Sequence, residues 1–319
     1  MKLFDVLIKQ PMMPLVMDGV ESRFSATRLF DQPDPAAFLA REGSRFKAIV
    51  TGGSSPTDAS LLDLLPNVGL ISSFGVGYDG IDVGYASQRG ITVTNTPDVL
   101  NDEVADTAIG LLISTVRRLP QADRYVREGK WLKANFQLTD TLRGKTMGIL
   151  GLGRIGKAIA RRAEAFGLKL AYHGRNHQPD VSYPYFPSLI EMAKAVDILM
   201  IIAPGGPATQ AIVNRDVLSA LGPRGILINV ARGTLVDEPA MVEMLQSGAL
   251  GAAGLDVFVD EPNVPTALFG LENVVLLPHV GSGSVDTRNR MGQLVIDNVV
   301  AYSEGLAPLT PVAETPWKG

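Results

Sequence analysis

The sequence predicts an α/β protein of two domains, the larger of them built on a doubly wound parallel sheet. The chain has 319 residues, of which 46% are hydrophobic, so it is long enough for more than one core. Short, continuously apolar runs alternate with segments of helical pattern. Such runs are typical of parallel strands that helices cover on both faces. A glycine-rich turn between one run and a helix indicates the type of sheet.

The composition excludes several classes of function. The chain has 29 basic and 33 acidic residues and a net charge of −4, so it offers no basic surface to nucleic acid or to an anionic membrane. It has no cysteine, which excludes disulfides, thiolate metal sites and a cysteine nucleophile. No apolar run reaches the length of a membrane span. We therefore expect a cytoplasmic protein whose partners are small molecules.

The first hundred residues predict a small α/β unit. Apolar runs bounded by turn residues predict strands at residues 6–8, 48–50, 69–71 and 91–93. The next segment, 101–118, begins with the capping residue Asn101 and two acids and ends with a basic pair. Acids near the start and bases near the end of a helix interact favourably with its dipole. We therefore expect one long helix here, mostly buried.

The rest of the chain predicts a second, larger sheet. Further strands are expected at residues 168–172, 197–203, 225–230, 254–258 and 274–277, and further helices at 189–194, 238–246 and 286–302. Most of these strands are too continuously apolar for a half-exposed sheet, so we expect them to be parallel.

A strand, a glycine turn and a helix follow one another from Met147 onward. In the pattern G-x-G-x-x-G, Gly151 allows the tight turn, Gly153 lets phosphates approach the backbone, and Gly156 lets the helix pack closely on the strand. The unpaired amides at the start of the helix attract anions. The same spacing also occurs in purely structural turns, but here an apolar strand precedes it and a helical pattern follows. This context predicts a site for a dinucleotide pyrophosphate.

The end of the next strand bears on which nicotinamide is bound. NAD-selective enzymes carry an acid about 20 residues beyond the glycines, and this sequence has Gly174, Arg175 and Asn176 there. Arg175 favours NADP(H), because its guanidinium can pair with a ribose 2′-phosphate. NAD(H) binding stays possible if Arg175 points into solvent while Asn176 holds a ribose hydroxyl. We interpret His173 and His177 as loop residues near this phosphate, because two histidines without further ligands make a poor metal site.

Three polar residues follow strand signals, at the end of a parallel sheet where ligands bind. Arg232 could hold a carboxylate with two hydrogen bonds, or could be an ordinary surface arginine. His279 lies between an apolar strand and a Gly-Ser loop, and histidine suits general acid and base catalysis. The alternative is a structural histidine. Glu261 could bind the ring and stabilise its charged form, with Asp260 as the alternative partner.

These motifs together resemble the D-isomer-specific 2-hydroxyacid dehydrogenases in order and spacing. The matching segments are Phe74-Gly-Val-Gly-Tyr-Asp79, the glycine turn 151–156, Asn229-Val-Ala-Arg-Gly233, Gly254-Leu-Asp-Val-Phe258 with Glu261-Pro262, and Pro278-His-Val-Gly-Ser282. The resemblance implies a Rossmann dinucleotide-binding domain at residues 100–284, inserted into a smaller flavodoxin-like substrate domain at 1–99 and 285–319. The chain departs from the pattern at Gly52–Ser55, which weakens any substrate contact assigned there.

The resemblance also implies roles. Arg232 would anchor the substrate carboxylate and polarise the carbonyl, Glu261 would orient His279, and His279 would donate the proton. Amides of Val76 and Gly77 would bind carboxylate oxygens, and Ser282 would also contact the substrate. The implied cofactor contacts are Thr107, Gly151, Leu152, Gly153, Arg154, Ile155, Gly156, Gly174, Arg175, Asn176, Ala203, Pro204, Thr209, Val230, Ala231, Arg232, Asp256, His279 and Gly281. The helix at 101–118 resembles the family's dimer-forming element, which predicts a homodimer.

Within the family, the chain most resembles NADPH-dependent glyoxylate and hydroxypyruvate reductases. A hydroxyphenylpyruvate reductase or a phosphoglycerate-type dehydrogenase would share the fold and differ in substrate. A dinucleotide-sensing corepressor-like protein would retain much of the site without turnover. The sequence leaves these alternatives open.

Overall fold

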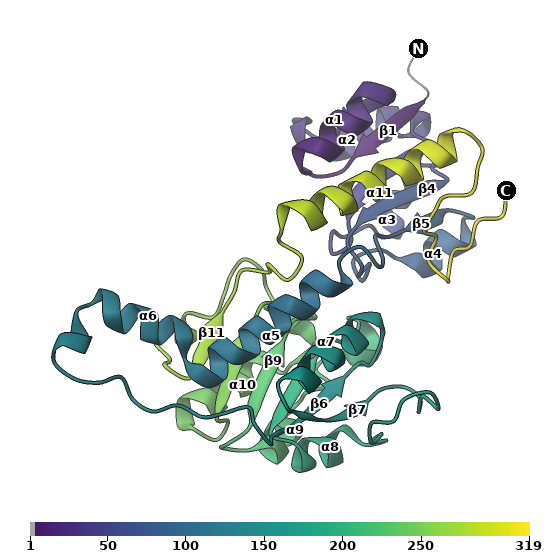
Figure 1. Cartoon of the computed structure of the whole chain (residues 1–319). Helices are drawn as coiled ribbons and strands as arrows, with labels where there is room; N and C mark the ends of the chain where they lie inside the picture. Colours follow the sequence, from purple (N-terminus) through teal and green to yellow (C-terminus); the bar gives the residue numbers. More distant parts are fainter. Residues whose placement is uncertain (1–3) are drawn as a thin grey trace. The chain divides into compact units, whose positions relative to one another are not determined.

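The computed structural model describes residues 4–319, and it divides the chain into two compact units. Unit 1 comprises the residues up to Leu100 together with Ser284–Gly319, and unit 2 is Asn101–Gly283. Each unit has a parallel sheet of its own (Figure 1). Residues 1–3 of the predicted smaller domain lie outside the described residues.

Unit 1 is built on five parallel strands in the order β2-β1-β3-β4-β5. This is the flavodoxin-like order that was expected. The strands are β1 (Asp5–Ile8), β2 (Ser25–Arg28), β3 (Ala48–Gly52), β4 (Leu70–Phe74) and β5 (Thr92–Thr94), and the helices are α1 (Pro14–Arg23), α2 (Pro35–Glu42), α3 (Ala59–Asp63), α4 (Val83–Gln88) and α11 (Val285–Ser303).

The sheet of unit 1 buries a core on each face, because successive strand residues point to opposite sides. One core contains Leu7, Ile49 and Ile71, and the other contains Val6, Val50 and Leu70. Helix α11 covers the second face, where Val295 and Val299 are fully buried. This helix returns from the end of the chain to complete a unit that began at the amino terminus.

Unit 2 is built on six parallel strands in the order β11-β10-β9-β8-β6-β7. The strands are β6 (Thr146–Leu150), β7 (Lys169–His173), β8 (Ile198–Ile201), β9 (Ile226–Asn229), β10 (Ala252–Leu255) and β11 (Val274–Leu276). The helices are α5 (Asn101–Arg117), α6 (Leu119–Arg127), α7 (Arg154–Ala165), α8 (Leu189–Ala195), α9 (Arg215–Leu221) and α10 (Glu238–Ser247). From β6 the chain goes first to β7 on one side and then to β8 on the other, so the sheet is doubly wound with its switch point between β6 and β8.

The helix boundaries follow from local chemistry. Helix α5 begins with two acids and ends at Arg117, because Arg118 adopts a left-handed conformation with φ of 50°. Asp237 caps α10 by accepting a hydrogen bond from the amide of Ala240 at 3.1 Å.

Among the described residues, no helix combines the length and the hydropathy that crossing a bilayer would require.

One predicted strand lies two to three residues earlier than expected. The strand expected at 254–258 is β10, and it ends at Leu255. The backbone then leaves the sheet, because the amide of Phe258 donates to Glu261 Oε1 at 3.1 Å instead of joining the strand ladder. Strand β2 was not predicted, since Ser25–Arg28 is short, polar and at the sheet edge.

Gly254 in β10 allows α5 to pack directly on the sheet. A Cβ at this position would lie 2.5 Å from Thr115 Oγ1 and 2.9 Å from Leu111 Cγ, both in α5. We expect Gly254→Val to lower the free energy of unfolding by about 1–3 kcal/mol through overpacking, measured by denaturant titration. The control is Gly270→Ala, because a Cβ there meets no atom within 4 Å. Equal stability of the two variants would contradict this packing.

Candidate active site

The glycine turn of unit 2 lies at the switch point of the sheet. Gly151 follows β6 with φ of 99°, and a Cβ there would lie 2.6 Å from the backbone nitrogen of Ala203, which follows β8. A Cβ at Gly156 would lie 2.3 Å from the carbonyl oxygen of Gly151. Both positions therefore require glycine, one for the turn and one for close packing of α7 on the turn.

The space beside Gly153 fits a pyrophosphate. A Cβ at Gly153 would meet no atom within 4 Å, unlike at Gly151 or Gly156. Gly153 is the N-cap of α7, and no side chain caps the first amides of this helix. A helix start that no side chain caps, together with an approachable backbone, suits a dinucleotide phosphate. Gln178 steadies the turn by donating to the carbonyl of Leu152 at 2.8 Å.

The segment after β7 leaves an arginine available. His173 Nδ1 lies 2.7 Å from the carbonyl oxygen of Phe186, and the hydroxyl of Tyr185 donates to the carbonyl of Gly174 at 3.2 Å. Arg175 and Asn176 are exposed. Among the described residues, the guanidinium of Arg175 has no hydrogen-bond or ion-pair partner. A positive charge with free donors thus stands at the carboxyl end of β7.

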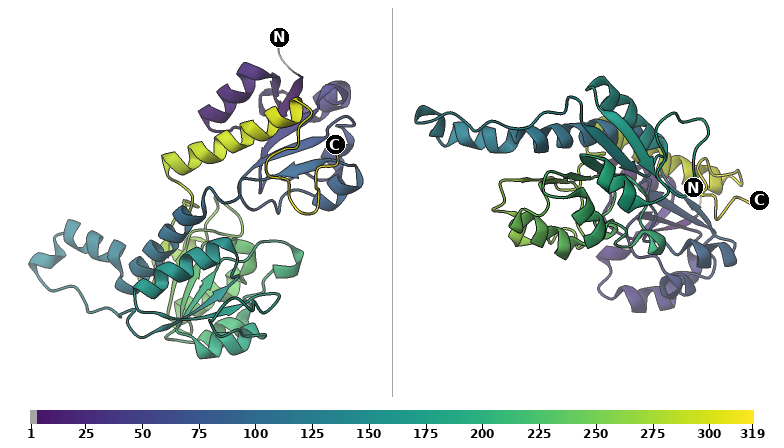
Figure 2. Two further views of the ribbon diagram at one scale, coloured as in Figure 1. Left: turned by 45° about the vertical axis from the view of Figure 1, so that its right-hand side comes forward. Right: turned by 90° about the horizontal axis from the view of Figure 1, so that it is seen from below.

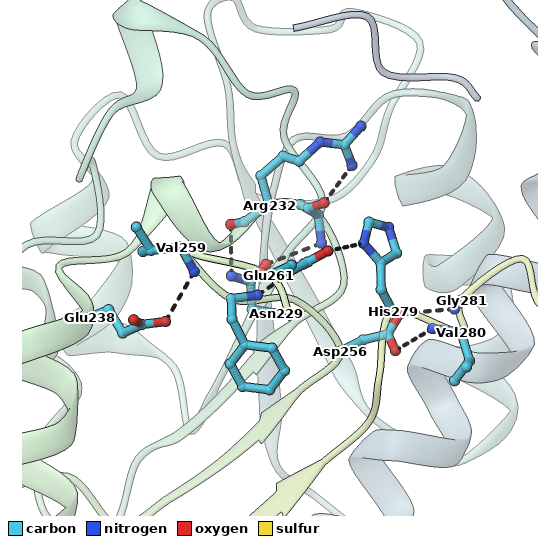
Figure 3. A network of polar contacts seen from close by, with 11 residues as sticks. Asn229, Arg232, Glu238, Asp256, Val259, Glu261, His279, Val280 and Gly281 are labelled. Carbon is cyan, nitrogen blue, oxygen red and sulfur yellow. Dashed lines mark hydrogen bonds and ion pairs between the residues drawn. The ribbon is translucent and has the colours of Figure 1, made fainter. Parts of the chain in front are cut away.

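Glu261 and His279 are in contact, as Figure 3 shows. His279 Nδ1 lies 2.7 Å from Glu261 Oε2. A carboxylate can only accept, so Nδ1 carries the proton and Nε2 is the free end of the ring. Glu261 is itself held, because its other oxygen accepts from the amide of Phe258. The alternative partner, Asp260, instead accepts from Asn263 Nδ2 at 3.1 Å.

Asp256 fixes the backbone that carries His279. This residue is 1% exposed, and its carboxylate accepts from the amides of Val280 at 2.7 Å and Gly281 at 2.8 Å. Its carbonyl accepts from the amide of His279 at 2.8 Å. Burial raises the pKa of the Asp256 carboxyl, and the two amides act in the opposite direction. His279 is held in a left-handed conformation with φ of 53°.

Arg232 follows β9 in a loop that Asn229 holds from within (Figure 3). The buried side chain of Asn229 accepts from the amide of Ala231 at 3.0 Å and donates to the carbonyl of Arg232 at 2.9 Å. The next residue, Gly233, packs so closely on the 256–261 loop that a Cβ would lie 2.0 Å from the carbonyl carbon of Phe258. The loops that carry Arg232 and Glu261 are therefore packed directly against each other.

Several other predicted cofactor residues lie on neighbouring strand ends of unit 2. Ala203 and Pro204 follow β8, Val230 and Ala231 follow β9, and Leu152, Arg154 and Ile155 belong to the glycine turn and the start of α7. The hydroxyl of Thr209 donates to the carbonyl of Pro204 at 2.8 Å, and that of Thr107 donates to the carbonyl of Gly281 at 3.2 Å. Both hydroxyls therefore hold loops in place. Ser282 is partly buried at the end of the His279 loop.

In unit 1, the predicted carboxylate-binding amides lie in a turn after β4. The turn is held by Thr96, whose hydroxyl accepts from the amide of Gly75 at 3.1 Å, and by Asn95, whose Nδ2 donates to the carbonyl of Val76 at 2.8 Å. Among the described residues, no protein group accepts from the amides of Val76 and Gly77. Two adjacent amides are thus free to bind an anion.

Sequence reasoning missed the residues that hold these loops. Asn229 was considered only as part of a motif and not as a residue that holds the loop. An asparagine at the end of a buried strand is a signal for such a turn, because its side chain can hydrogen-bond to the backbone that follows. Glu238 was also missed, and its Oε2 accepts from the amide of Val259 at 3.1 Å. That contact joins two segments that are far apart in sequence, so no local pattern could have indicated it.

This fold and geometry define a class of protein. A glycine turn at the switch point of a doubly wound sheet, with a carboxylate-held imidazole on another strand end, is the arrangement of a dinucleotide-dependent oxidoreductase. A family model described as "D-isomer specific 2-hydroxyacid dehydrogenase, NAD binding domain" matches residues 109–281. The chain belongs to this family.

Individual relatives agree with the family. The chain is 49% identical to glyoxylate/hydroxypyruvate reductase A of Arabidopsis thaliana over 98% of this chain and 100% of that one. It is 48% identical, with the same coverage, to hydroxyphenylpyruvate reductase of Plectranthus scutellarioides. The crystal structure of an NADPH-dependent glyoxylate/hydroxypyruvate reductase from Sinorhizobium meliloti, in complex with NADP and malonate, matches with a TM-score of 0.94 and 49% identity. That match covers 100% of this chain and 99% of that one.

The contact between Glu261 and His279 generates a prediction about turnover. We expect Glu261→Gln to lower kcat by about tenfold, because a neutral amide holds the ring by a weaker hydrogen bond than a carboxylate does. The measurement is steady-state kcat, compared with the KM for the coenzyme. Asp260→Asn is the matched control, since Asp260 does not contact His279. An unchanged kcat in Glu261→Gln would remove Glu261 from this role.

Proposed function

We propose that this protein uses NADPH to reduce small 2-oxo acids, glyoxylate and hydroxypyruvate above all, to D-2-hydroxy acids. The observation that carries the proposal is the 2.7 Å contact between His279 Nδ1 and Glu261 Oε2, on a loop beside that of Arg232. The names of the relatives from Arabidopsis thaliana and Sinorhizobium meliloti support the substrate and the coenzyme.

The site residues suit hydride transfer to a carbonyl. With its pyrophosphate held at the glycine turn, the reduced dinucleotide would supply a hydride for the 2-oxo carbon. The guanidinium of Arg232 pairs with the substrate carboxylate and stabilises the negative charge that grows on the carbonyl oxygen. His279 gives the proton on Nε2 to that oxygen, which completes the hydroxyl. Glu261 holds the ring by Nδ1 and stabilises the imidazolium before transfer.

The remaining assignments extend this scheme. The amides of Val76 and Gly77 are assigned to substrate carboxylate oxygens, and Ser282 is assigned to substrate binding. The cofactor contacts are assigned to the glycine turn, to the segment 174–176 and to Thr107, Ala203, Pro204, Thr209, Val230, Ala231, Asp256 and Gly281. NADPH is preferred because Arg175 has donors free for the 2′-phosphate, and NADH remains a weaker alternative.

A second substrate is favoured by one observation. The relative from Plectranthus scutellarioides, at 48% identity, is named hydroxyphenylpyruvate reductase. A phosphoglycerate-type dehydrogenase would be a further variant of the same chemistry, whereas a dinucleotide-sensing corepressor-like protein would bind NADPH without turnover. The reaction itself therefore has to be measured.

A steady-state panel tests the reaction. Glyoxylate, hydroxypyruvate, pyruvate and hydroxyphenylpyruvate are each assayed with NADPH and with NADH. We expect the highest kcat/KM with NADPH and one of the first two acids. His279→Ala should lower kcat by about 10²- to 10⁴-fold, because it removes the general acid, and it should weaken NADPH binding, measured by fluorescence, much less. A wild-type protein without turnover, or a fully active His279→Ala variant, would contradict the proposal.

Arg175 generates a prediction about the coenzyme. We expect Arg175→Ala to raise the KM for NADPH by about 10- to 100-fold, the loss of a charge-assisted hydrogen bond to phosphate. The KM for NADH should stay unchanged, because NADH lacks that phosphate. Lys169→Ala is a suitable control, since it removes an exposed cation from the other end of β7. Equal effects on NADPH and NADH would argue against this role of Arg175.

A homodimer and a cytoplasmic location complete the proposal. Both views in Figure 2 show α6 and the segment after it extending from the body of unit 2. Trp131 is 63% exposed on this segment, Leu132 93% and Leu138 100%. Large apolar side chains exposed on a projecting segment favour burial against another chain, and α5 leads directly into it.

A further inference from the structure

A short loop of unit 1 packs against the turn that carries the amides of Val76 and Gly77. The loop, residues 53–57, follows β3 as the turn follows the neighbouring strand β4. The amide of Thr57 donates to the carbonyl of Gly80 at 2.8 Å, and the amide of Gly80 donates to the carbonyl of Gly53 at 2.9 Å. A Cβ at Gly53 would lie 1.8 Å from the carbonyl oxygen of Gly77. With contact this close, the turn cannot hold its position unless the loop does.

The ammonium group of Lys9 holds this loop. Lys9 follows β1, and its Nζ donates to Ser55 Oγ at 2.9 Å, to Thr57 Oγ1 at 3.3 Å and to the carbonyl of Pro56. Burial lowers the pKa of Lys9, and the nearby carboxylate of Asp58 acts in the opposite direction. That carboxylate is itself engaged, because it caps α3 through the amide of Leu61. The acceptors that bind the ammonium directly are therefore all uncharged.

Lys9 is the side chain that hydrogen-bonds to this loop from outside it, within the part of the chain that the structure describes. Thr51 and Ser73 lie opposite each other at the ends of β3 and β4, yet their buried hydroxyls have no protein partner there. The hydroxyl of Thr57 donates only within the loop, to the carbonyl of Ser55 at 3.1 Å. From outside the loop, the side-chain hydrogen bonds to residues 53–57 come from Lys9.

We propose that Lys9 is a positioning residue for substrate binding, which acts by holding the 53–57 loop against the turn of Val76 and Gly77. Lys9 does not touch the substrate. It keeps the two amides in the geometry that a carboxylate needs, so its loss weakens binding of 2-oxo acids and leaves the chemical step intact. This inference rests on the proposed function, which assigns the carboxylate to those amides.

The test separates KM from kcat. Lys9→Met keeps the length of the side chain and removes its hydrogen bonds. We expect the KM for glyoxylate and the inhibition constant of malonate to rise about tenfold, the loss of hydrogen bonds from a charged donor, with kcat and the KM for NADPH unchanged. Lys9→Arg should recover most of the affinity. Lys47→Met is the control, because Lys47 is exposed at the opposite end of the same sheet.

A second variant distinguishes failure of this inference from failure of the proposed function. Asn95→Leu removes the hydrogen bond to the carbonyl of Val76 and so disturbs the turn without touching the loop. If Asn95→Leu raises the KM for glyoxylate and Lys9→Met does not, the amides bind the carboxylate and the role of Lys9 is wrong. If neither variant changes the KM for glyoxylate, the assignment of the carboxylate to these amides is wrong, and so is the positioning role of Lys9. Thermal unfolding of each variant verifies that it is folded.

Discussion

The position of His279 depends on one buried carboxylate, that of Asp256. Asp256 follows β10, and it fixes the segment after β11 through two backbone amides and its own carbonyl. This anchoring holds His279 in a left-handed conformation that a free chain would rarely adopt. In this conformation the ring of His279 contacts Glu261. Glu261 lies in the loop that follows β10, as Asp256 does.

Much of the fold could be predicted because parallel strands buried on both faces leave a strong apolar signal. The expected strands of both sheets, the long helix α5 and the glycine turn are all present. Strand β2 escaped because a polar edge strand has no such signal. The end of β10 was misplaced because Val257 and Phe258 are buried in a loop, and burial alone does not distinguish a loop from a strand.

Candidate site residues could be proposed from the sequence, whereas most of the residues that hold their loops could not. Arg232, Glu261 and His279 could be chosen because polar side chains after parallel strands collect at one edge of a sheet. The choice between Glu261 and Asp260 depended on the path of a loop, which the sequence does not encode locally. Glu238 and Lys9 bind segments that are distant in the sequence, so their roles become visible only when those segments are placed together. Asn229 instead holds its own loop, through a local pattern that the sequence does contain.

The order of the strands in unit 2 separates the residue proposed to select the coenzyme from the residues proposed for catalysis. Arg175 follows β7 at one edge of the sheet, whereas Arg232, Glu261 and His279 follow β9, β10 and β11 toward the other edge. Substitutions that share no contacts usually have additive effects. Under the proposed function, a change of coenzyme therefore calls for substitutions at one strand end, away from the residues proposed for catalysis.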